Sequence, residues 1–469
     1  MNKGTSYGKN SLADHLFVVG ELALLIVSSF IASYVFSYFI TPVPFDVRVL
    51  NAVIFAAAVM LSALSVGLYD QQLRESSKGI LKRVVITLLF SAFLLEVVVF
   101  NIFTTISIGG WYMLWSCAIS AVLITSFRAF FHYHDITRIS RRRVLILGSG
   151  ERASIIEKRM RRTVDRRNFE ILGFVRIDGD KKDALDNDKI IDLNVQEDLF
   201  QYVMEHAVDQ LVIACDERRN MLPVEHLFKC KTRGIDVVEI LDFIEQETGQ
   251  IAVNLIYPSW VIYSNGFETK KWFKSSLDYR LNVVLAIFVM ALTWPIMLVT
   301  ALLIYLEDGR KTGASVFYKQ VRVGIDGKPF YIIKFRSMGP NAEANGAQWA
   351  TKDDMRVTRV GRIIRKYRID ELPQLLNVLR GEMGFVGPRP ERPEFVCELE
   401  KNIPYYSQRH NVKPGLTGWA QLKYPYGATT EDSMEKLKFD LYYIKHRSLL
   451  LDLVILIRTV EIVLFGKGR

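Results

Sequence analysis

The run LNVVLAIFVMALTWPIMLVTALLIYL, residues 281–306, decides the architecture of the chain, because it is apolar enough to enter a membrane and carries a proline near its middle. Pro295 removes one helical hydrogen bond and its ring pushes against the carbonyl of Ala291, so a helix should bend there. Each half then has about 12–14 residues, or roughly 20 Å of helix, which is too short for a hydrocarbon core of about 30 Å. The run predicts a re-entrant helix–break–helix that enters one leaflet and returns.

Basic residues flank this run on both sides, which favours placing both of its ends in the cytosol. The alternative is a kinked transmembrane helix, which would place residues 310–469 on the far face of the membrane, away from cytosolic nucleotides. The sequence favours the re-entrant arrangement. The flanking residues are Lys270, Lys271, Lys274 and Arg280 before the run, and Arg310, Lys311 and Lys319 after it.

Four more apolar segments precede this run, and each has roughly the 20 residues that a helix needs to cross a bilayer. We therefore expect a helical bundle of four spans within residues 1–135. The segments lie at about residues 16–40, 49–69, 83–103 and 108–127.

The basic connector at 70–82, and the arginines that follow the fourth segment, predict that these two ends of the bundle face the cytosol. Everything after residue 140 would then be cytosolic. Glu21 and Glu96 lie inside predicted spans, where an acid is costly and is often functional. The alternative, which we favour, is that each glutamate is bonded to a neighbouring helix inside the bundle.

The composition agrees with membrane segments joined to water-exposed parts, since half of the 469 residues are hydrophobic and 110 are charged. A net charge of +10 suits an acidic partner such as phospholipid head groups or phosphorylated substrates. Nucleic-acid binding fits poorly with five apolar membrane segments. The four cysteines are scattered without metal or redox spacing, which predicts reduced thiols.

Residues 140–250 alternate between apolar runs and amphipathic stretches, which predicts an α/β, Rossmann-like domain with a parallel sheet. Helices are expected at 151–162, 195–207 and 223–234. The predicted strands are RRRVLILGSG (141–150), FEILGFVRID (169–178), DQLVIACD (209–216) and IDVVEI (235–240).

A glycine motif lies between the first of these strands and the first helix, where a dinucleotide site would have it. It runs from Gly148 through Gly150 to Ala153, and the two glycines are the candidate cofactor-binding residues. No acidic residue follows the second strand at the usual distance, since Asp178 comes late. A bound nucleotide and a degenerate structural or regulatory domain therefore both stay open. The Tyr-x-x-x-Lys pair of a sugar-modifying dehydrogenase is absent from this domain.

The C-terminal part begins with SVFYKQVRVGIDGKPFYIIKFRSM (315–338), which predicts two strands joined by a turn and carries Lys334 and Arg336. The stretch YRIDELPQLLNVL (367–379) follows. Pro373 indicates where the helix starts, because proline is tolerated only in the first helical turn. Asp370 should then be close to the N-cap and Glu371 to the first helical position. A plain helix cap is one interpretation, and a nucleophilic carboxylate beside a phosphate site is the other.

Two turn-rich loops come next. The turn Gly387-Pro388-Arg389-Pro390 fixes an arginine, whose planar fork suits phosphate oxygens. The loop VKPGLTGWAQ (412–421) adds Lys413 and Gln421. Each loop alone is a weak signal, but several of them interleaved with cations favour a phosphate-binding site.

Taken together, these motifs closely resemble the bacterial sugar transferase family, the polyprenyl-phosphate hexose-1-phosphate transferases of the monotopic phosphoglycosyl transferase superfamily. The resemblance covers about residues 270–469, and the full layout looks like that of the long members that initiate exopolysaccharide synthesis. Gly384 departs from the serine that is usual there. The matching stretches are KFRSM (334–338), RIDELPQLLNVLRGEMGFVGPRP (368–390), KPGLTGWAQ (413–421) and YYIKHRSLLLDLVILIRTV (442–460).

The resemblance implies a catalytic module at 268–469, with its re-entrant helix in the bacterial inner membrane and its active site facing the cytosol. A UDP-sugar would give its hexose 1-phosphate to undecaprenyl phosphate, with Mg²⁺ as cofactor and a homo-oligomer as a possible assembly. Asp370 would be the nucleophile and Glu371 a metal ligand or base, and both carboxylates are candidate ligands of Mg²⁺. Which sugar is used, glucose or galactose or an N-acetylhexosamine, is left open, with glucose favoured. Phosphate contacts are expected from Lys334, Arg336, Arg368, Arg389, Lys413 and Gln421.

Two rival functions make different predictions. A membrane-anchored, NAD-dependent nucleotide-sugar dehydratase or epimerase would bind its cofactor tightly at the glycine motif. A non-catalytic scaffold for polysaccharide assembly would tolerate Asp370→Asn without any change in sugar transfer to lipid.

Overall fold

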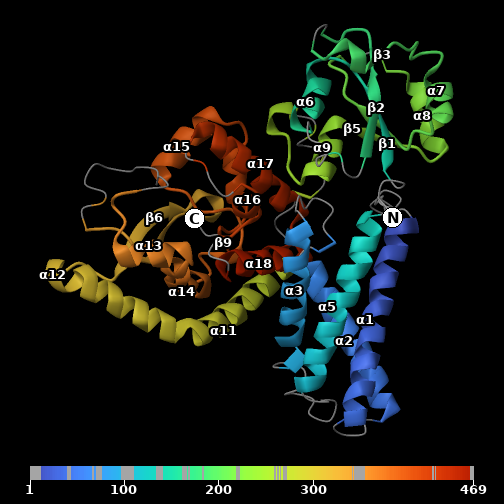
Figure 1. The fold of residues 1–469 in the computed structure, drawn as a ribbon. Coiled ribbons are helices and arrows are strands. Elements are labelled where there is room, and N and C mark those ends of the chain that lie inside the picture. The colour runs from blue at the N-terminus through green and yellow to red at the C-terminus, as the bar shows by residue number, and fades with distance from the viewer. Residues whose placement is uncertain are drawn as a thin grey trace. The chain divides into compact units, whose positions relative to one another are not determined.

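The computed structural model resolves two compact units, Met1–Glu247 and Thr248–Arg469, and each is described by itself (Figure 1). The structure describes residues 12–39, 44–65, 68–69, 77–93, 95–96, 110–133, 141–160, 166, 169–181, 184–217, 222–257, 260, 264, 266–267, 272–340, 342, 354–424, 427 and 429–464.

The first unit begins with long apolar helices, as the sequence predicts. Helices α1, α2 and α5 each contain a stretch long and apolar enough to cross a membrane, and α11 of the second unit contains a fourth. Helix α3 has only the shorter apolar stretch Arg83–Ala92, and residues 97–103 of the predicted third span lie outside the described residues. The bounds are α1 Leu12–Phe39, α2 Phe45–Ser65, α3 Ser77–Phe93 and α5 Gly110–Tyr133.

Glu21 is bonded inside this bundle, which confirms the favoured interpretation of that residue. Its carboxylate is 1% exposed and pairs with Arg128, whose terminal nitrogen donates at 2.8 Å. The Tyr69 hydroxyl also donates to Glu21. Because Glu21 lies on α1 and Arg128 on α5, the pair fixes the register of these two helices.

A five-stranded parallel sheet in the order β3-β2-β1-β4-β5 follows the bundle in sequence. This confirms the predicted Rossmann-like domain and its predicted strands and helices. Strand β3 and helix α9 were not predicted. The strands are β1 Arg142–Leu147, β2 Phe169–Val175, β3 Ile190–Ile191, β4 Gln210–Ile213 and β5 Asp236–Glu239. The helices are α6 Glu151–Arg159, α7 Leu199–Glu205, α8 Val224–Thr232 and α9 Ile240–Thr248.

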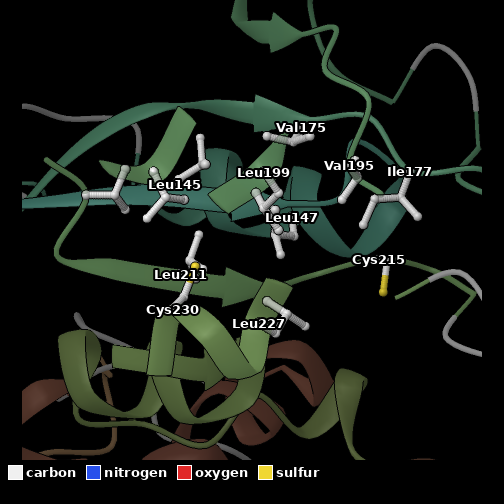
Figure 2. Close-up of a cluster of buried hydrophobic side chains, with 12 residues drawn as sticks. Leu145, Leu147, Val175, Ile177, Val195, Leu199, Leu211, Cys215, Leu227 and Cys230 are labelled. Atoms are coloured by element: carbon white, nitrogen blue, oxygen red, sulfur yellow. The ribbon is translucent and has the colours of Figure 1, made fainter. Parts of the chain in front are cut away.

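The core of this domain lies between the sheet and its helices (Figure 2). Leu145 and Leu147 of β1 and Leu211 of β4 meet Leu199 of α7, and all four are fully buried. Leu227 and Cys230 of α8 belong to the same cluster. Burial is nearly continuous along β1 and β4, as is typical of parallel strands covered on both faces, and this explains why the apolar runs alone locate the sheet.

The second unit opens with α11, Trp272–Ile304, which continues as a π-helical turn, Tyr305–Gly309, and as α12, Arg310–Thr312. The prediction of two half-helices separated by a break is wrong, because the helical backbone passes through Pro295 without interruption. Neighbouring turns of a long helix keep their hydrogen bonds when one proline bends it. Figure 1 shows α11 bent near its middle.

The predicted hairpin is present: β6 and β7 pair antiparallel around a 3₁₀ turn, Ile325–Gly327. The next elements are α13, a 3₁₀ turn at Ile369–Gln374, and α14. Strands β8 and β9 form a small parallel pair. The bounds are β6 Phe317–Val323, β7 Pro329–Phe335, α13 Arg359–Lys366, α14 Leu375–Leu379, β8 Gly384–Val386, α15 Pro393–Asn402, β9 Gly415–Thr417, α16 Trp419–Lys423, α17 Thr430–His446 and α18 Leu449–Leu464.

Candidate active site

Asp370 and Glu371 lie in a tight 3₁₀ turn, not at the N-cap of an α-helix as the sequence predicts. Arg368 precedes them with φ 54° and ψ 23°, a left-handed conformation that costs a non-glycine residue about 1 kcal/mol. Arg368 lies between the end of α13 and the start of the 3₁₀ turn, and its left-handed conformation changes the direction of the chain there. Pro373 sits inside the turn, and the α-helix proper begins only at Leu375.

Glu371 is the centre of a cluster of cations. Its side chain is buried and Arg389 donates to its Oε1 at 2.8 Å. Lys334 Nζ lies 3.4 Å from the same oxygen, and Arg368 lies 3.3 Å from Oε2. Burial alone would raise the pKa of Glu371, but the charges of Arg389, Lys334 and Arg368 outweigh it and hold that pKa well below its usual range. Glu371 is therefore ionised at neutral pH.

Asp370 has the opposite environment. Within the part of the chain that the structure describes, its carboxylate accepts no hydrogen bond and forms no ion pair. Burial, followed by the negative charge of Glu371, raises the pKa of Asp370 to about 6, although Lys334, Arg365 and Arg389 pull it down. Asp370 is thus ionised at neutral pH and its oxygens are unengaged, which suits a nucleophile.

Arg389 is held in place by a buried set of side chains behind the turn 387–390. Arg409 donates at 2.9 Å to the backbone carbonyl of Arg389 and at 2.9 Å to the carboxylate of Asp440. Arg409 and Asp440 are 6% and 3% exposed, so this ion pair is protected from solvent. Tyr406 accepts a further hydrogen bond of 2.7 Å from Arg409. Sequence reasoning missed this set, although Arg409 lies three residues before the loop 412–421 and Asp440 lies two residues before the stretch 442–460.

The turn also needs its glycine. A Cβ on Gly387 would come within 2.4 Å of the Lys413 carbonyl oxygen, so only glycine lets the two loops meet. Gly387 N donates at 2.9 Å to the Thr417 carbonyl beside this contact. The loop at 412–421 therefore supports the loop that carries Arg389.

Asn377 is a second residue that sequence reasoning missed. It is fully buried, accepts a hydrogen bond from Ile333 N at 3.2 Å, and donates to the Tyr331 carbonyl at 2.7 Å. These bonds tie α14 to β7, the strand that carries Lys334. The signal was available in LLNVL, where a polar residue lies among apolar ones on a core-facing helix.

The remaining predicted phosphate ligands do not meet the dyad. Arg336, Lys413 and Gln421 form no hydrogen bond or ion pair with Asp370 or Glu371 in the described residues. Lys413 lies 5.2 Å from the ring centre of Tyr279, on α11. Among the described residues, a terminal nitrogen of Arg336 and the amide nitrogen of Gln421 are buried and have no hydrogen-bond partner, so both are available to another group.

The fit of Mg²⁺ differs between the two acids. Both oxygens of Glu371 contact cations, and a further cation there would compete with all three. The carboxylate of Asp370 is open, and Mg²⁺ is commonly bound by one or two carboxylates together with substrate phosphates. Asp370 therefore fits the metal, whereas Glu371 in this arrangement does not.

An open carboxylate beside a fixed cluster of cations, in a module that carries a membrane-capable helix, defines a membrane-associated protein built to handle phosphorylated substrates. Comparison with known proteins agrees. Residues 270–466 match the family model for bacterial sugar transferases, and residues 64–222 match a CoA-binding domain. The chain belongs to the bacterial sugar transferase family, as its motifs predict.

Three relatives illustrate the similarity. An uncharacterized sugar transferase of Bacillus subtilis is 41% identical over 191 residues, which are 40% of this chain and 87% of that protein. A UDP-glucose:undecaprenyl-phosphate glucose-1-phosphate transferase of Xanthomonas campestris is 28% identical over 98% of this chain and 95% of its own length. Because the Xanthomonas campestris relative aligns over nearly the whole chain, the match fits the predicted long type.

The third relative is named for a different sugar. It is the UDP-N-acetylgalactosamine-undecaprenyl-phosphate N-acetylgalactosaminephosphotransferase of Aeromonas hydrophila, which is 41% identical over 52% of this chain. The aligned region spans 55% of that relative's length. The similarity therefore supports the chemistry of the family more than a choice of sugar.

Proposed function

We propose that this protein transfers a hexose 1-phosphate from a UDP-sugar to undecaprenyl phosphate and thereby initiates the assembly of an exopolysaccharide repeat unit. The observation that carries the proposal is the contrast within the dyad: Glu371 is engaged by three cations, while Asp370 is ionised and unengaged. The names of the relatives supply the class of donor and acceptor.

In the first step, an Asp370 oxygen attacks the phosphorus that carries the sugar. The bond from this phosphorus to the bridging oxygen breaks, UMP leaves with the electron pair, and a covalent aspartyl sugar-phosphate forms. In the second step, a phosphate oxygen of undecaprenyl phosphate attacks the same phosphorus and the carboxylate of Asp370 leaves. One phosphoanhydride replaces another, so no outside energy source is needed.

The fixed cations stabilise the negative charge of the phosphoryl group. Arg389 and Lys334 lie on the Oε1 side of Glu371, and Arg368 on its Oε2 side. Glu371 holds them apart from Asp370 and keeps them oriented before the donor arrives. Asp370 would hold Mg²⁺, and the ion would supply further neutralisation of charge on the phosphates.

We propose that α11 is re-entrant, although its helix is unbroken. Near its start, Asn282 accepts a 2.7 Å hydrogen bond from Phe385 N. Near its end, Ile304 packs against Phe335 and Ile364. On a straight helix, Asn282 and Ile304 would be about 33 Å apart, which is the thickness of a hydrocarbon core. A straight helix would therefore place these two residues at opposite faces of the membrane. Since both ends contact one folded module, entry and exit on the same membrane face are favoured.

The middle of α11 supports the same arrangement, because its large apolar side chains are exposed in the part of the chain that the structure describes. Such a surface is unfavourable in water and fits lipid. The positive residues at both flanks then favour the cytosol for the whole catalytic module. The exposed side chains are Val284, Ile287, Phe288, Leu292, Trp294, Ile296, Leu298 and Val299.

The proposed sugar is glucose, because the relative that aligns with 98% of this chain is named for glucose. N-acetylgalactosamine is the alternative that the Aeromonas hydrophila relative raises. A homo-oligomer stays a prediction. The rival scaffold function needs no open carboxylate beside the cations. The NAD-dependent rival needs a glycine loop that is free to bind its cofactor.

The decisive test uses full-length protein in detergent with Mg²⁺ and a UDP-sugar labelled with ³²P in the phosphate next to the sugar. Without acceptor lipid, wild type should retain label after denaturation, and hydroxylamine, which cleaves acyl phosphates, should release it. Asp370→Asn should retain none. Asp326→Asn is the matched control, because Asp326 is exposed in the hairpin turn. Label that persists in Asp370→Asn would refute the covalent mechanism.

UDP-glucose and UDP-N-acetylgalactosamine should then be compared as donors with undecaprenyl phosphate present. A kcat/KM at least tenfold higher for UDP-glucose would support the proposed sugar. The reverse ratio would assign the protein to the other donor and leave the mechanism untouched.

A further inference from the structure

The glycine loop of the sheet domain lies where a parallel α/β sheet binds nucleotides. The strand order β3-β2-β1-β4-β5 reverses between β1 and β4, and ligands bind such sheets at the carboxyl ends of the strands beside this reversal. Gly148 to Gly150 follow β1, and Asp216 follows β4. In a dinucleotide-binding protein, the amides of this loop and of the next helix would face a pyrophosphate.

In this protein a carboxylate of the same chain already faces those amides. Asp216 accepts hydrogen bonds of 2.9 Å from Glu151 N and of 2.9 Å from Arg152 N, the first two amides of α6. It also accepts from Lys181 N at 3.3 Å. An anion is therefore already bound at the N-terminus of α6, and it is covalently part of the domain.

A second carboxylate completes the arrangement. Asp180, after β2, accepts from Ser149 N at 2.7 Å and from Asp216 N at 2.9 Å. The two aspartates together receive five backbone amides from three separate loops. We call Asp180 and Asp216 the aspartate clasp. It joins the ends of β1, β2 and β4.

The space that glycine leaves is filled by the clasp. A Cβ on Gly150 would come within 1.9 Å of an Asp216 carboxylate oxygen. In a nucleotide-binding loop, the glycine at this point allows the backbone to approach the pyrophosphate. Here the same glycine allows the approach of Asp216, so the glycine motif is explained without a nucleotide.

We infer that the glycine loop is a structural joint closed by the aspartate clasp, and that it does not take the pyrophosphate of CoA, NAD or another nucleotide. The match to a CoA-binding domain is therefore a match of fold, and the residues present do not fit the ligand. A phosphate would have to displace the Asp216 carboxylate from three backbone amides. It would also face the carboxylates of Asp180 and Asp216, which repel it.

The inference is tested on full-length protein in detergent. Equilibrium dialysis with radiolabelled CoA, and separately with NAD, should give no saturable binding at millimolar ligand. Backbone hydrogen exchange should show protection of Ser149, Glu151 and Arg152 without any ligand, and CoA should leave it unchanged. Saturable binding, or protection that appears only with CoA, would overturn the inference.

Variants test the clasp itself. Asp216→Ser should lower the unfolding temperature of this domain by several degrees, because three backbone amides lose their acceptor. Asp209→Asn is the control, since Asp209 accepts one exposed backbone amide, Arg143 N at 2.9 Å, at the other end of the sheet. An unfolding temperature of Asp216→Ser equal to that of the control would contradict the clasp. If Asp216→Ser does not fold, the wild-type exchange measurement decides.

Discussion

The guanidinium of Arg389 donates a 2.8 Å hydrogen bond to Glu371 Oε1, although the two residues are 18 positions apart in the chain. Because Arg389 approaches Glu371 and forms no ion pair with Asp370 in the described residues, two adjacent carboxylates acquire opposite properties. The pKa of Glu371 falls and that of Asp370 rises to about 6. Paired acids whose pKa values are driven apart in this way mark distinct chemical roles.

At limiting Mg²⁺, turnover should fall as the pH drops through about 6, because protonation of Asp370 removes the attacking anion. The charge of Glu371 contributes to this raised pKa, so Glu371→Gln should move the acid limb to lower pH while kcat falls. The measurement is kcat/KM against pH, which reports the free enzyme. Asp326→Asn should leave the limb in place. An unmoved limb in Glu371→Gln would mean that Asp370 is not the titrating group.

Asp370→Asn should unfold at a higher temperature than wild type at pH 8. The folded-state pKa of Asp370, about 6, exceeds its ordinary value of 3.8, so its ionised form destabilises the folded protein. This penalty is absent below about pH 4, grows as the pH rises through 6, and reaches at most about 3 kcal/mol. Intrinsic tryptophan fluorescence on heating, at pH 4 and pH 8, measures the difference. Equal transitions at pH 8 would contradict the raised pKa.

The sequence was sufficient to predict an element wherever a few consecutive residues carry the pattern for it. The apolar runs at 144–147 and 211–213 predict β1 and β4, and the turn at 325–328 predicts the hairpin. Strand β3 was missed because it has two residues, too few for a periodic pattern. Pro295 predicted a break that the structure does not have, since a proline bends a long helix more easily than it ends one.

The candidate site was predictable in its residues and not in its geometry. The identities of Glu371, Lys334 and Arg389 follow from the motifs, but their convergence depends on how β7 and the turn 387–390 pack on the dyad. The left-handed Arg368 has no sequence signal, because arginine rarely adopts that conformation. Gly150 resembled a nucleotide motif, and only the position of Asp216, 66 residues later, explains it.

Asn377→Ala should destabilise the catalytic module by about 2–4 kcal/mol, because it leaves Ile333 N and the Tyr331 carbonyl without their buried partner. Turnover should fall too, since β7 carries Lys334. Asn411→Ala is the control: Asn411 is exposed, and within the described residues its side chain bonds to the Gln408 side chain alone, so a change within about 0.5 kcal/mol is expected. Urea unfolding followed by fluorescence measures both. Equal midpoints would refute the role of Asn377 in joining α14 to β7.

Glu307→Ala should lower kcat more than it changes KM. In the π-helical turn after α11, Glu307 accepts hydrogen bonds from Arg359 N at 2.9 Å and Val360 N at 3.2 Å, the first amides of α13. Losing this cap weakens α13 by about 1 kcal/mol, and α13 leads directly to the dyad. The neighbouring Asp308→Ala is the control, and Glu307→Gln should recover part of kcat through its carbonyl oxygen. Steady-state kinetics of the three variants, in detergent and in liposomes, would measure kcat and KM separately. If kcat is unaltered in Glu307→Ala, the membrane helix does not position the dyad through this contact.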